Sequence, residues 1–450
     1  MVKSVIFLIR FTSITLTISP DLPIRVRVKA GSHTAGVLIL AAKRRAAKST
    51  WSTHQHRQPN RSREQTAMPL PTTFESGILR LPLFEDEHRV LASRIEGWCA
   101  DRKDAWERPA NAEPSERCRG LLAELGRAGW LGHLHPDKWA RDLRSVCIRR
   151  QALAFHEDLA DFVYSIQELT AAAIIRHGSD EQRWRYLPGL AAGTSAGALA
   201  LSEPGAGSDL GSVALAAARD GNGFVLNGVK TWIAQGDIAQ VYVVLARTGD
   251  GPGPLGLTTF LVDGRAPGLK ATPIAAIAPR SWAELTFTDC HVGPEAVLGE
   301  RGCGYVVALD VLERARVTVA AAAIGFARRS YRHALERARG RRAYASRLAD
   351  LQLVKSALSA MDVKLAAASL LTARAAWAAD HDEDYAKYAA VAKLHATEAA
   401  GEIVDATVQI FGAAGLVADS PVERLYRQVR SLRIYEGPSE VLEMIIADAL

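Results

Sequence analysis

The sequence predicts an α+β protein in which a helical domain, a small antiparallel barrel or sandwich, and a helix bundle follow one another. Three observations support this order. In residues 84–188 apolar side chains recur at helical spacing and strand signals are scarce. Residues 195–305 hold short alternating runs rich in Gly, Val, Thr and Leu. From Tyr305 the chain is rich in Ala and Leu, in periodic segments of helix-bundle length.

The first 67 residues differ from the rest in composition. They hold 12 Lys and Arg against two acids, whereas the remaining residues hold 43 and 47, so the body is mildly acidic. The apolar run 5–18 is interrupted by Arg10 and is too short for a transmembrane helix. An Arg- and Ser-rich, acid-poor segment is typical of an organelle transit peptide. We favour instead a disordered or non-native extension that ends before Met68, where acid-containing sequence begins.

The amino-acid composition is that of a globular protein and argues against several functional classes. Hydrophobic residues make up 48% and charged residues 23%, an ordinary globular balance. The five cysteines form no CxxC pair, which predicts reduced cytoplasmic thiols and no metal site. The acidic body argues against nucleic-acid binding, and we expect no membrane association.

The elements follow in order from the pattern of apolar residues. In the N-terminal domain, helices are expected around 90–98, 121–132, 145–155 and 164–176. Strands are expected at 223–229, 239–247, 257–263 and 283–287. Long helices are expected at 309–339, 348–379 and 385–411, and a fourth after the glycine-containing break at 412–415. The predicted boundaries are therefore 1–67, 68–193, 194–304 and 305–450.

Two segments of the β domain combine glycine with polar side chains. LSEPGAGSD at 201–209 allows tight turning and close approach of a ligand, although most such segments are surface turns. In GVKTWIAQG at 228–236, Trp232 stands beside polar residues. A tryptophan between strand residues is usually part of the core, but here it can also offer a stacking surface.

Two further segments lie in the C-terminal region. RRAYAS at 341–346 is either a solvated helix face or, through Arg341, a clamp for a pyrophosphate. QIFGAAG at 409–415 breaks two helices, and IYEGP places Glu436 in a loop. A lone carboxylate in a loop is normally a surface charge.

Together these segments resemble the acyl-CoA dehydrogenase family. The resemblance extends from about Phe84 to Leu450 and rests on LSEPGAGSD, NGVKTWI, FGAAG and PVERLYR…IYEG, in that order and spacing. It implies an N-terminal helical domain, a central antiparallel β-barrel and a C-terminal four-helix bundle. It also implies non-covalent FAD between barrel and bundle, and a homotetramer or homodimer in which a neighbouring subunit reaches the adenosine half of FAD.

The implied reaction removes two hydrogens from adjacent carbons of an acyl thioester. A base takes the α-proton, and the β-hydride goes to N5 of FAD. Glu436 matches the family's base, which should be a buried carboxylate with a raised pKa. Some members carry the base just before the arginine matched by Arg316, but Ala315 stands there, and Glu313 lies on another helix face. Ser208, Arg316 and Gly437 match residues near the substrate.

The resemblance also assigns cofactor contacts. One group would pack on the flavin ring and a second would meet the pyrophosphate and adenosine. Ala234 replaces the Thr or Ser that usually bonds N5, and Ala413 replaces a glycine. The residues concerned are Leu199, Leu201, Ser202, Trp232 and Ala234 for the ring, and Arg341, Tyr344, Gln409, Gly412 and Ala413 for the rest.

The departures favour a specialised substrate carried by coenzyme A or an acyl carrier protein. An electron-transfer flavoprotein is the expected electron acceptor. Three other interpretations remain open: an acyl-CoA oxidase, which keeps the glutamate; a flavin monooxygenase, which generally lacks it; and a non-catalytic flavoprotein that binds DNA. The acidic body and Glu436 argue against the last two.

Overall fold

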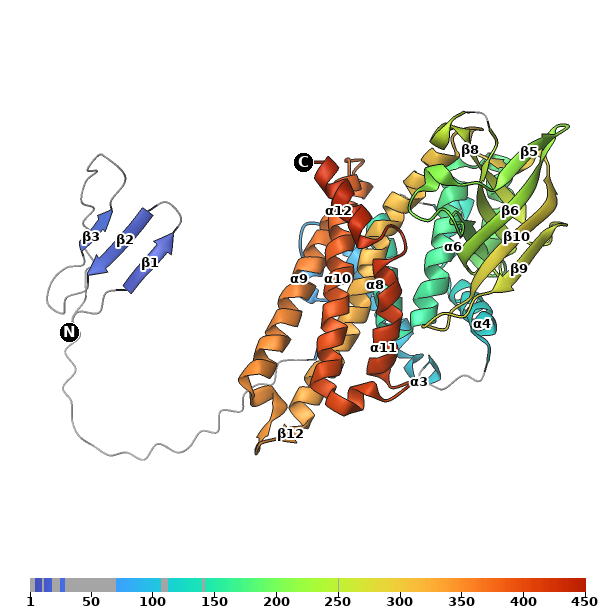
Figure 1. Cartoon of the computed structure of the whole chain (residues 1–450). Helices are drawn as coiled ribbons and strands as arrows, with labels where there is room; N and C mark the ends of the chain where they lie inside the picture. Colours follow the sequence, from blue (N-terminus) through green and yellow to red (C-terminus); the bar gives the residue numbers. More distant parts are fainter. Residues whose placement is uncertain are drawn as a thin grey trace, which may run out of the picture. The chain divides into compact units, whose positions relative to one another are not determined.

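The computed structural model describes residues 5–9, 12–17, 25–28, 70–106, 112–139, 142–249 and 251–450. The chain divides into two compact units, Met1–Ala67 and Met68–Leu450. In the first unit, β1 (Val5–Ile9), β2 (Thr12–Thr17) and β3 (Arg25–Val28) form an antiparallel sheet (Figure 1). The rest of this segment lies outside the described residues. That it is a disordered or non-native extension stays a prediction.

The first domain of the second unit is helical, as predicted. Local capping fixes where its helices begin: Asp142 accepts a hydrogen bond from the Ser145 backbone, and Ser179 forms a reciprocal capping box with Gln182. Gly193 ends α7 with φ +67°, in the left-handed region where glycine is favoured. The helices are α1 (Ser76–Leu79), α2 (Asp86–Ala100), α3 (Lys103–Trp106), α4 (Pro114–Arg127), α5 (Leu143–His156), α6 (Asp158–His177) and α7 (Asp180–Ala192).

A single β-sheet forms the middle domain, with strand order β11-β8-β7-β5-β6-β10-β9. Most pairings are antiparallel, as expected, but β4 and β5 each pair with β7 in parallel. A parallel pair needs a long connection, and the segment from β4 through β6 supplies it. The strands are β4 (Gly197–Ala200), β5 (Ala216–Asp220), β6 (Gly223–Ala234), β7 (Val241–Arg247), β8 (Leu257–Asp263), β9 (Leu269–Pro273), β10 (Trp282–Val292) and β11 (Val297–Leu298).

The third domain is a helix bundle, and its three long helices are confirmed. After the break at 412–415, however, the chain forms two short helices instead of a fourth long one. In Figure 1, α8, α9 and α10 lie side by side, and α8 also packs against α5 of the first domain. Alanines at 320–323 are almost fully buried in α8, and their small side chains permit close helix packing. The elements are α8 (Gly304–Gly340), β12 (Arg342–Ala343), β13 (Ser346–Arg347), α9 (Gln352–Asp380), α10 (Ala386–Phe411), α11 (Pro421–Arg430) and α12 (Ser439–Asp448).

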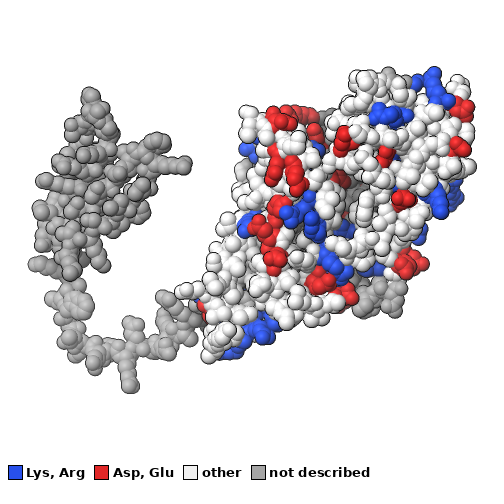
Figure 2. Space-filling model, viewed as in Figure 1, with Lys and Arg blue, Asp and Glu red and all other residues white. Residues whose placement is uncertain are grey.

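Among the described helices, α9 alone is long and apolar enough to cross a membrane. It packs along α8 and α10, and a core helix of a bundle satisfies the same criteria. On the face of the second unit shown in Figure 2, acidic and basic side chains are interspersed, with no basic stripe among the coloured residues. Neither feature adds support for a membrane or a nucleic-acid partner.

The β domain is fixed to the helical domain by close backbone packing. Gly197 in β4 faces Thr170 of α6, and a Cβ at that glycine would lie 2.6 Å from the threonine Cγ2. Helix α6 also contacts α8, where Arg314 of α8 donates from Nε to Glu168 of α6 at 2.9 Å and both side chains are buried. The first contact holds β4 against α6, and the second joins α6 to α8.

Candidate active site

Glu436 lies in the turn between a short 3-10 segment, Ser431–Arg433, and helix α12. Its φ is +58° and that of Gly437 is +96°, so two consecutive residues adopt left-handed backbone conformations. A non-glycine residue rarely adopts this conformation unless the surroundings impose it. The carboxylate therefore projects from a sharply turned loop, as the sequence predicted, and not from a helix.

The carboxylate of Glu436 is held in an unusual electrostatic environment. Its Oε2 atom is buried and has no hydrogen-bond partner among the described residues. Burial raises the pKa of Glu436, and the positive charges of Lys393, Arg150 and Arg316 oppose that rise. A carboxylate with one buried, unpaired oxygen and a raised pKa is suited to accept a proton.

Arg316 of α8 lies beside the same turn. Only 7% of the residue is exposed, and its buried Nε atom has no hydrogen-bond partner within the part of the chain that the structure describes. That Nε is 3.9 Å from the position a Cβ would occupy on Gly437. Burial lowers the pKa of Arg316, which Glu313 and Glu436 partly offset. The structure thus brings together Glu436, Gly437 and Arg316, three of the predicted site residues.

Lys393 of α10 also reaches this turn, and the sequence analysis did not identify it. Its side chain is fully buried, and Nζ donates a hydrogen bond of 2.6 Å to the carbonyl of Gly437. Burial lowers the pKa of Lys393 to about 8, while Glu436 opposes the decrease. A single lysine in an Ala-rich helix gave no signal that it points inward.

Buried ion pairs lie near the turn that carries Glu436. Arg150 of α5 binds both carboxylate oxygens of Asp161 of α6 at 2.9 Å, and Thr318 of α8 at 3.0 Å. Arg280 pairs with Asp158 and donates to Ser431 Oγ at 3.1 Å. The start of β10 is thereby tied to the segment that carries Glu436.

The predicted flavin-ring group gathers where β4 and β6 end. Trp232 has φ +58° and is 53% exposed, and its ring meets Trp282 edge to face at 6.3 Å. Ala234 pairs with Trp282 in the strand register. Ser202 accepts from the Thr231 backbone at 2.9 Å. Of the other predicted residues here, Leu201 is buried, Leu199 is partly buried in β4 and Ser208 is exposed.

A buried ion pair that the sequence analysis missed shapes this region. Lys230 of β6 donates from Nζ to Glu203 and to the Leu201 carbonyl, both at 2.8 Å. Glu203 also accepts from the backbones of Ala214 and Leu215. The pair therefore closes the loop that begins with LSEPGAGSD. Both residues stand inside the quoted motifs, so the motifs themselves were the signal.

The remaining predicted cofactor residues lie at the other end of the bundle. Arg341 and Tyr344 belong to the hairpin of β12 and β13, and Tyr344 is 92% exposed. Arg337, in the last turn of α8 before this hairpin, donates to the Phe411 carbonyl at the end of α10 at 3.2 Å. The other members, Gln409, Gly412 and Ala413, are exposed.

This group is distant from Glu436 within one chain. Gln409 lies 16 residues beyond Lys393 on α10, which corresponds to about 24 Å of helix. One chain therefore does not bring all the predicted residues into one site.

The two groups suit an FAD molecule. Trp232 and Tyr344 present aromatic faces to solvent, and Arg337 has a buried Nε without a partner. Gly412 has φ +64° and ψ −145°, a glycine conformation, with open space where a Cβ would stand. Such space permits close approach of a ligand to the backbone.

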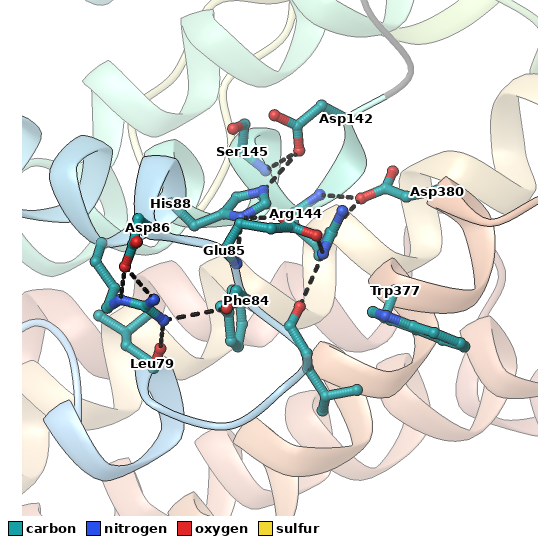
Figure 3. Close-up of polar contacts among 12 residues, drawn as sticks. Leu79, Phe84, Glu85, Asp86, His88, Asp142, Arg144, Ser145, Trp377 and Asp380 are labelled. Atoms are coloured by element: carbon teal, nitrogen blue, oxygen red, sulfur yellow. Dashed lines mark hydrogen bonds and ion pairs between the residues drawn. The ribbon is translucent and has the colours of Figure 1, made fainter.

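A second polar cluster, around Arg144, has a structural role (Figure 3). Arg144 donates to Asp380 at 2.7 Å and to Glu85 and the Leu83 carbonyl, each at 2.9 Å. His88 contacts Asp142 at 3.1 Å. These contacts join α2, α5 and α9 beside a cavity of about 40 Å³, which has room for a few water molecules. Because these carboxylates are already hydrogen-bonded, this cluster is not suited to proton abstraction.

The sequence was compared with protein families and with known proteins. Models of the N-terminal, middle and C-terminal domains of acyl-CoA dehydrogenase match residues 85–194, 198–290 and 302–450. The chain is 38% identical over 280 residues to the mitochondrial short-chain specific acyl-CoA dehydrogenase of Rattus norvegicus, covering 62% of this chain and 68% of that protein. It is 33% identical over 374 residues to cyclohexane-1-carbonyl-CoA dehydrogenase of Geobacter metallireducens, covering 80% and 97%.

A solved structure agrees with this result. The glutaryl-CoA dehydrogenase of Mycobacterium smegmatis in complex with FADH2 superposes with a TM-score of 0.73 at 26% identity, covering 82% of this chain and 95% of that one. The likeness extends through all three domains of the second unit.

Proposed function

Because the chain belongs to the acyl-CoA dehydrogenase family, with all three domains present, we propose that it dehydrogenates an acyl thioester between Cα and Cβ, with Glu436 as the base. It is an oxidoreductase of that family. The observation that supports the base is the buried, unpaired Oε2 of Glu436. The residue carrying it also matches the family's base in the IYEG segment.

The surrounding charges suit this role. Burial raises the pKa of Glu436, whereas the positive charges of Lys393, Arg150 and Arg316 favour its ionised form. The balance leaves the carboxylate basic enough to take a proton yet able to ionise. Arg316, beside Gly437, has an unpaired Nε that is free to hydrogen-bond a substrate. Ser208, on the exposed part of the 201–209 segment, is the proposed contact for the thioester arm.

We propose FAD as the cofactor, and when bound it supplies the two-electron acceptor. The ring would be held by Leu199, Leu201, Ser202, Trp232 and Ala234 of one copy. A second copy is proposed to supply Arg341, Tyr344, Gln409, Gly412 and Ala413, because Gln409 lies about 24 Å along α10 from Lys393 and the hairpin that carries Tyr344 lies at the same end of the bundle. The protein is therefore proposed to be a homotetramer or homodimer. An electron-transfer flavoprotein is the proposed acceptor, and the thioester is carried by coenzyme A or a carrier protein.

The test is anaerobic bleaching of the purified flavoprotein with a panel of acyl thioesters. Glu436→Gln keeps the shape of the side chain but removes the base, so flavin reduction should slow by about 10²- to 10⁴-fold. Flavin content and thioester binding should be retained.

Glu313→Gln is the control, since it removes another carboxylate of raised pKa, on α8. It should leave most of the rate. Bleaching of the Glu436 variant at the wild-type rate would place the base elsewhere. If oxygen re-oxidises the reduced flavin faster than an electron-transfer flavoprotein does, the protein is an acyl oxidase.

A further inference from the structure

We propose that Lys393 is a positioning residue that holds the turn of Glu436 and keeps a positive charge beside it. This inference rests on the proposed function, because it takes Glu436 as the base. The contact that carries it is the hydrogen bond from Lys393 Nζ to the Gly437 carbonyl, 2.6 Å long and made by a fully buried side chain.

A buried ammonium is costly unless its surroundings use its charge. Within the part of the chain that the structure describes, no carboxylate lies in ion-pair contact with Lys393. Its hydrogen-bond acceptor is a neutral carbonyl. Much of its positive charge is therefore left to act on the groups around it.

The turn itself needs support. Glu436 and Gly437 are both left-handed, and the strain of a left-handed glutamate persists only where contacts on either side enforce it. Helix α10 makes three such contacts. Glu398 accepts from Arg433 at 2.8 Å before the turn and from Ser439 at 2.5 Å after it. Lys393 holds the centre, at Gly437.

The charges that face the pair come from several elements. Glu436 faces Lys393 of α10, Arg150 of α5 and Arg316 of α8. Lys393 faces Glu436, Arg316, Glu398 of its own helix and Glu440 of α12. Since Lys393 favours the ionised carboxylate, its removal raises the pKa of Glu436 further. The rate should then begin to fall at a higher pH as the solution is acidified.

The experiment uses the FAD-loaded protein and compares Lys393→Met, which keeps length but removes charge and donor, with Lys393→Arg. Lys387→Met is the control, because Lys387 lies on the same helix and donates to the Ala449 carbonyl at 3.2 Å, near the C-terminus. The rate of anaerobic flavin reduction by a thioester is measured from pH 5 to 9. Hydrogen exchange of peptides spanning residues 431–440 is measured in parallel.

For Lys393→Met we expect the acidic limb of the pH–rate profile, where the rate of flavin reduction falls as pH is lowered, to move up by about one pH unit. Hydrogen exchange of the 431–440 peptides should become faster. Lys393→Arg should restore the limb, and Lys387→Met should match wild type in both measurements. An unshifted limb together with unchanged exchange in folded, flavin-containing Lys393→Met would overturn the inference.

If none of the thioesters reduces the flavin of the wild-type protein, the proposed function fails. The hydrogen-exchange measurement still decides whether Lys393 holds the turn. Thermal unfolding of each variant separates a folding defect from these effects. Should Lys393→Met not fold, Lys393→Gln is used, since it keeps a donor while removing the charge. Lys393→Gln should then shift the limb with little change in exchange.

Discussion

At the scale of single residues, Glu436 combines a backbone conformation typical of glycine with a buried oxygen, Oε2, that has no hydrogen-bond partner among the described residues. Both features are unfavourable in isolation. They occur together because α10, α8 and α5 surround the turn with three cations and fixed hydrogen bonds. This arrangement suits the proton transfer proposed for Glu436.

This environment predicts the pH dependence of the reductive step. Burial raises the pKa of Glu436 above its ordinary value of 4.5, and only the ionised carboxylate can take the α-proton. Flavin reduction at saturating thioester should therefore fall, as pH is lowered, at a point above 4.5. Stopped-flow measurements across pH provide the check. A rate that stays constant down to pH 4.5 would contradict it, and the residual rate of Glu436→Gln should lack this limb.

At the scale of elements, the loop from Leu201 to Leu215 owes its shape to the Glu203–Lys230 pair, which is buried at the end of β6. Removing one partner of a buried pair leaves the other without compensation. A loop so disturbed should also lose its hold on the flavin.

We therefore expect Lys230→Met to lower the free energy of unfolding by about 3–5 kcal/mol and to reduce flavin content. Denaturant unfolding and the flavin-to-protein absorbance ratio measure the two effects. Lys270→Met, at an exposed position of β9, is the control and should change neither. Equal stability of the two variants would show that the pair does not fix the loop.

The hairpin of β12 and β13 predicts a different outcome. Tyr344 is 92% exposed, so Tyr344→Ala removes little packing within one chain. If this ring covers the cofactor of a neighbouring copy, the variant should lose most of its FAD while the unfolding temperature of the flavin-free protein stays unchanged. Tyr426→Ala, at a half-exposed tyrosine of α11, should keep its FAD. Full flavin content in the Tyr344 variant would show that the hairpin does not contribute to FAD binding.

At the scale of the whole molecule, the chain separates at residue 67 into two units. The acid-poor composition of the first unit gave the same boundary. A protein that starts at Met68 should therefore fold, bind FAD and reduce it as the full chain does. Flavin content, sedimentation and thioester bleaching test this. Loss of any of the three would show that residues 1–67 take part in the fold.

The order of the three domains and the place of Glu436 could be predicted because they depend on local patterns. Periodicity separates helices from strands, and IYEGP marks a loop whatever surrounds it. Lys393 and the Arg150–Asp161 pair could not be predicted in the same way. A lysine or arginine on a helix is usually solvated, and only the packing of α5, α6, α8 and α10 makes these side chains internal.

The pairing of Arg314 with Glu168, which joins α8 to α6, also constrains how the gene can change. The two codons are 146 positions apart, yet a mutation that neutralises either one leaves a buried, unpaired charge. A second mutation that makes the other position apolar removes that charge and can restore folding. Second-site suppressors of a defective Glu168 allele should therefore recur at codon 314. Sequences that descend from this one should therefore keep both charges or lose both, because lineages carrying only one of the changes are at a disadvantage.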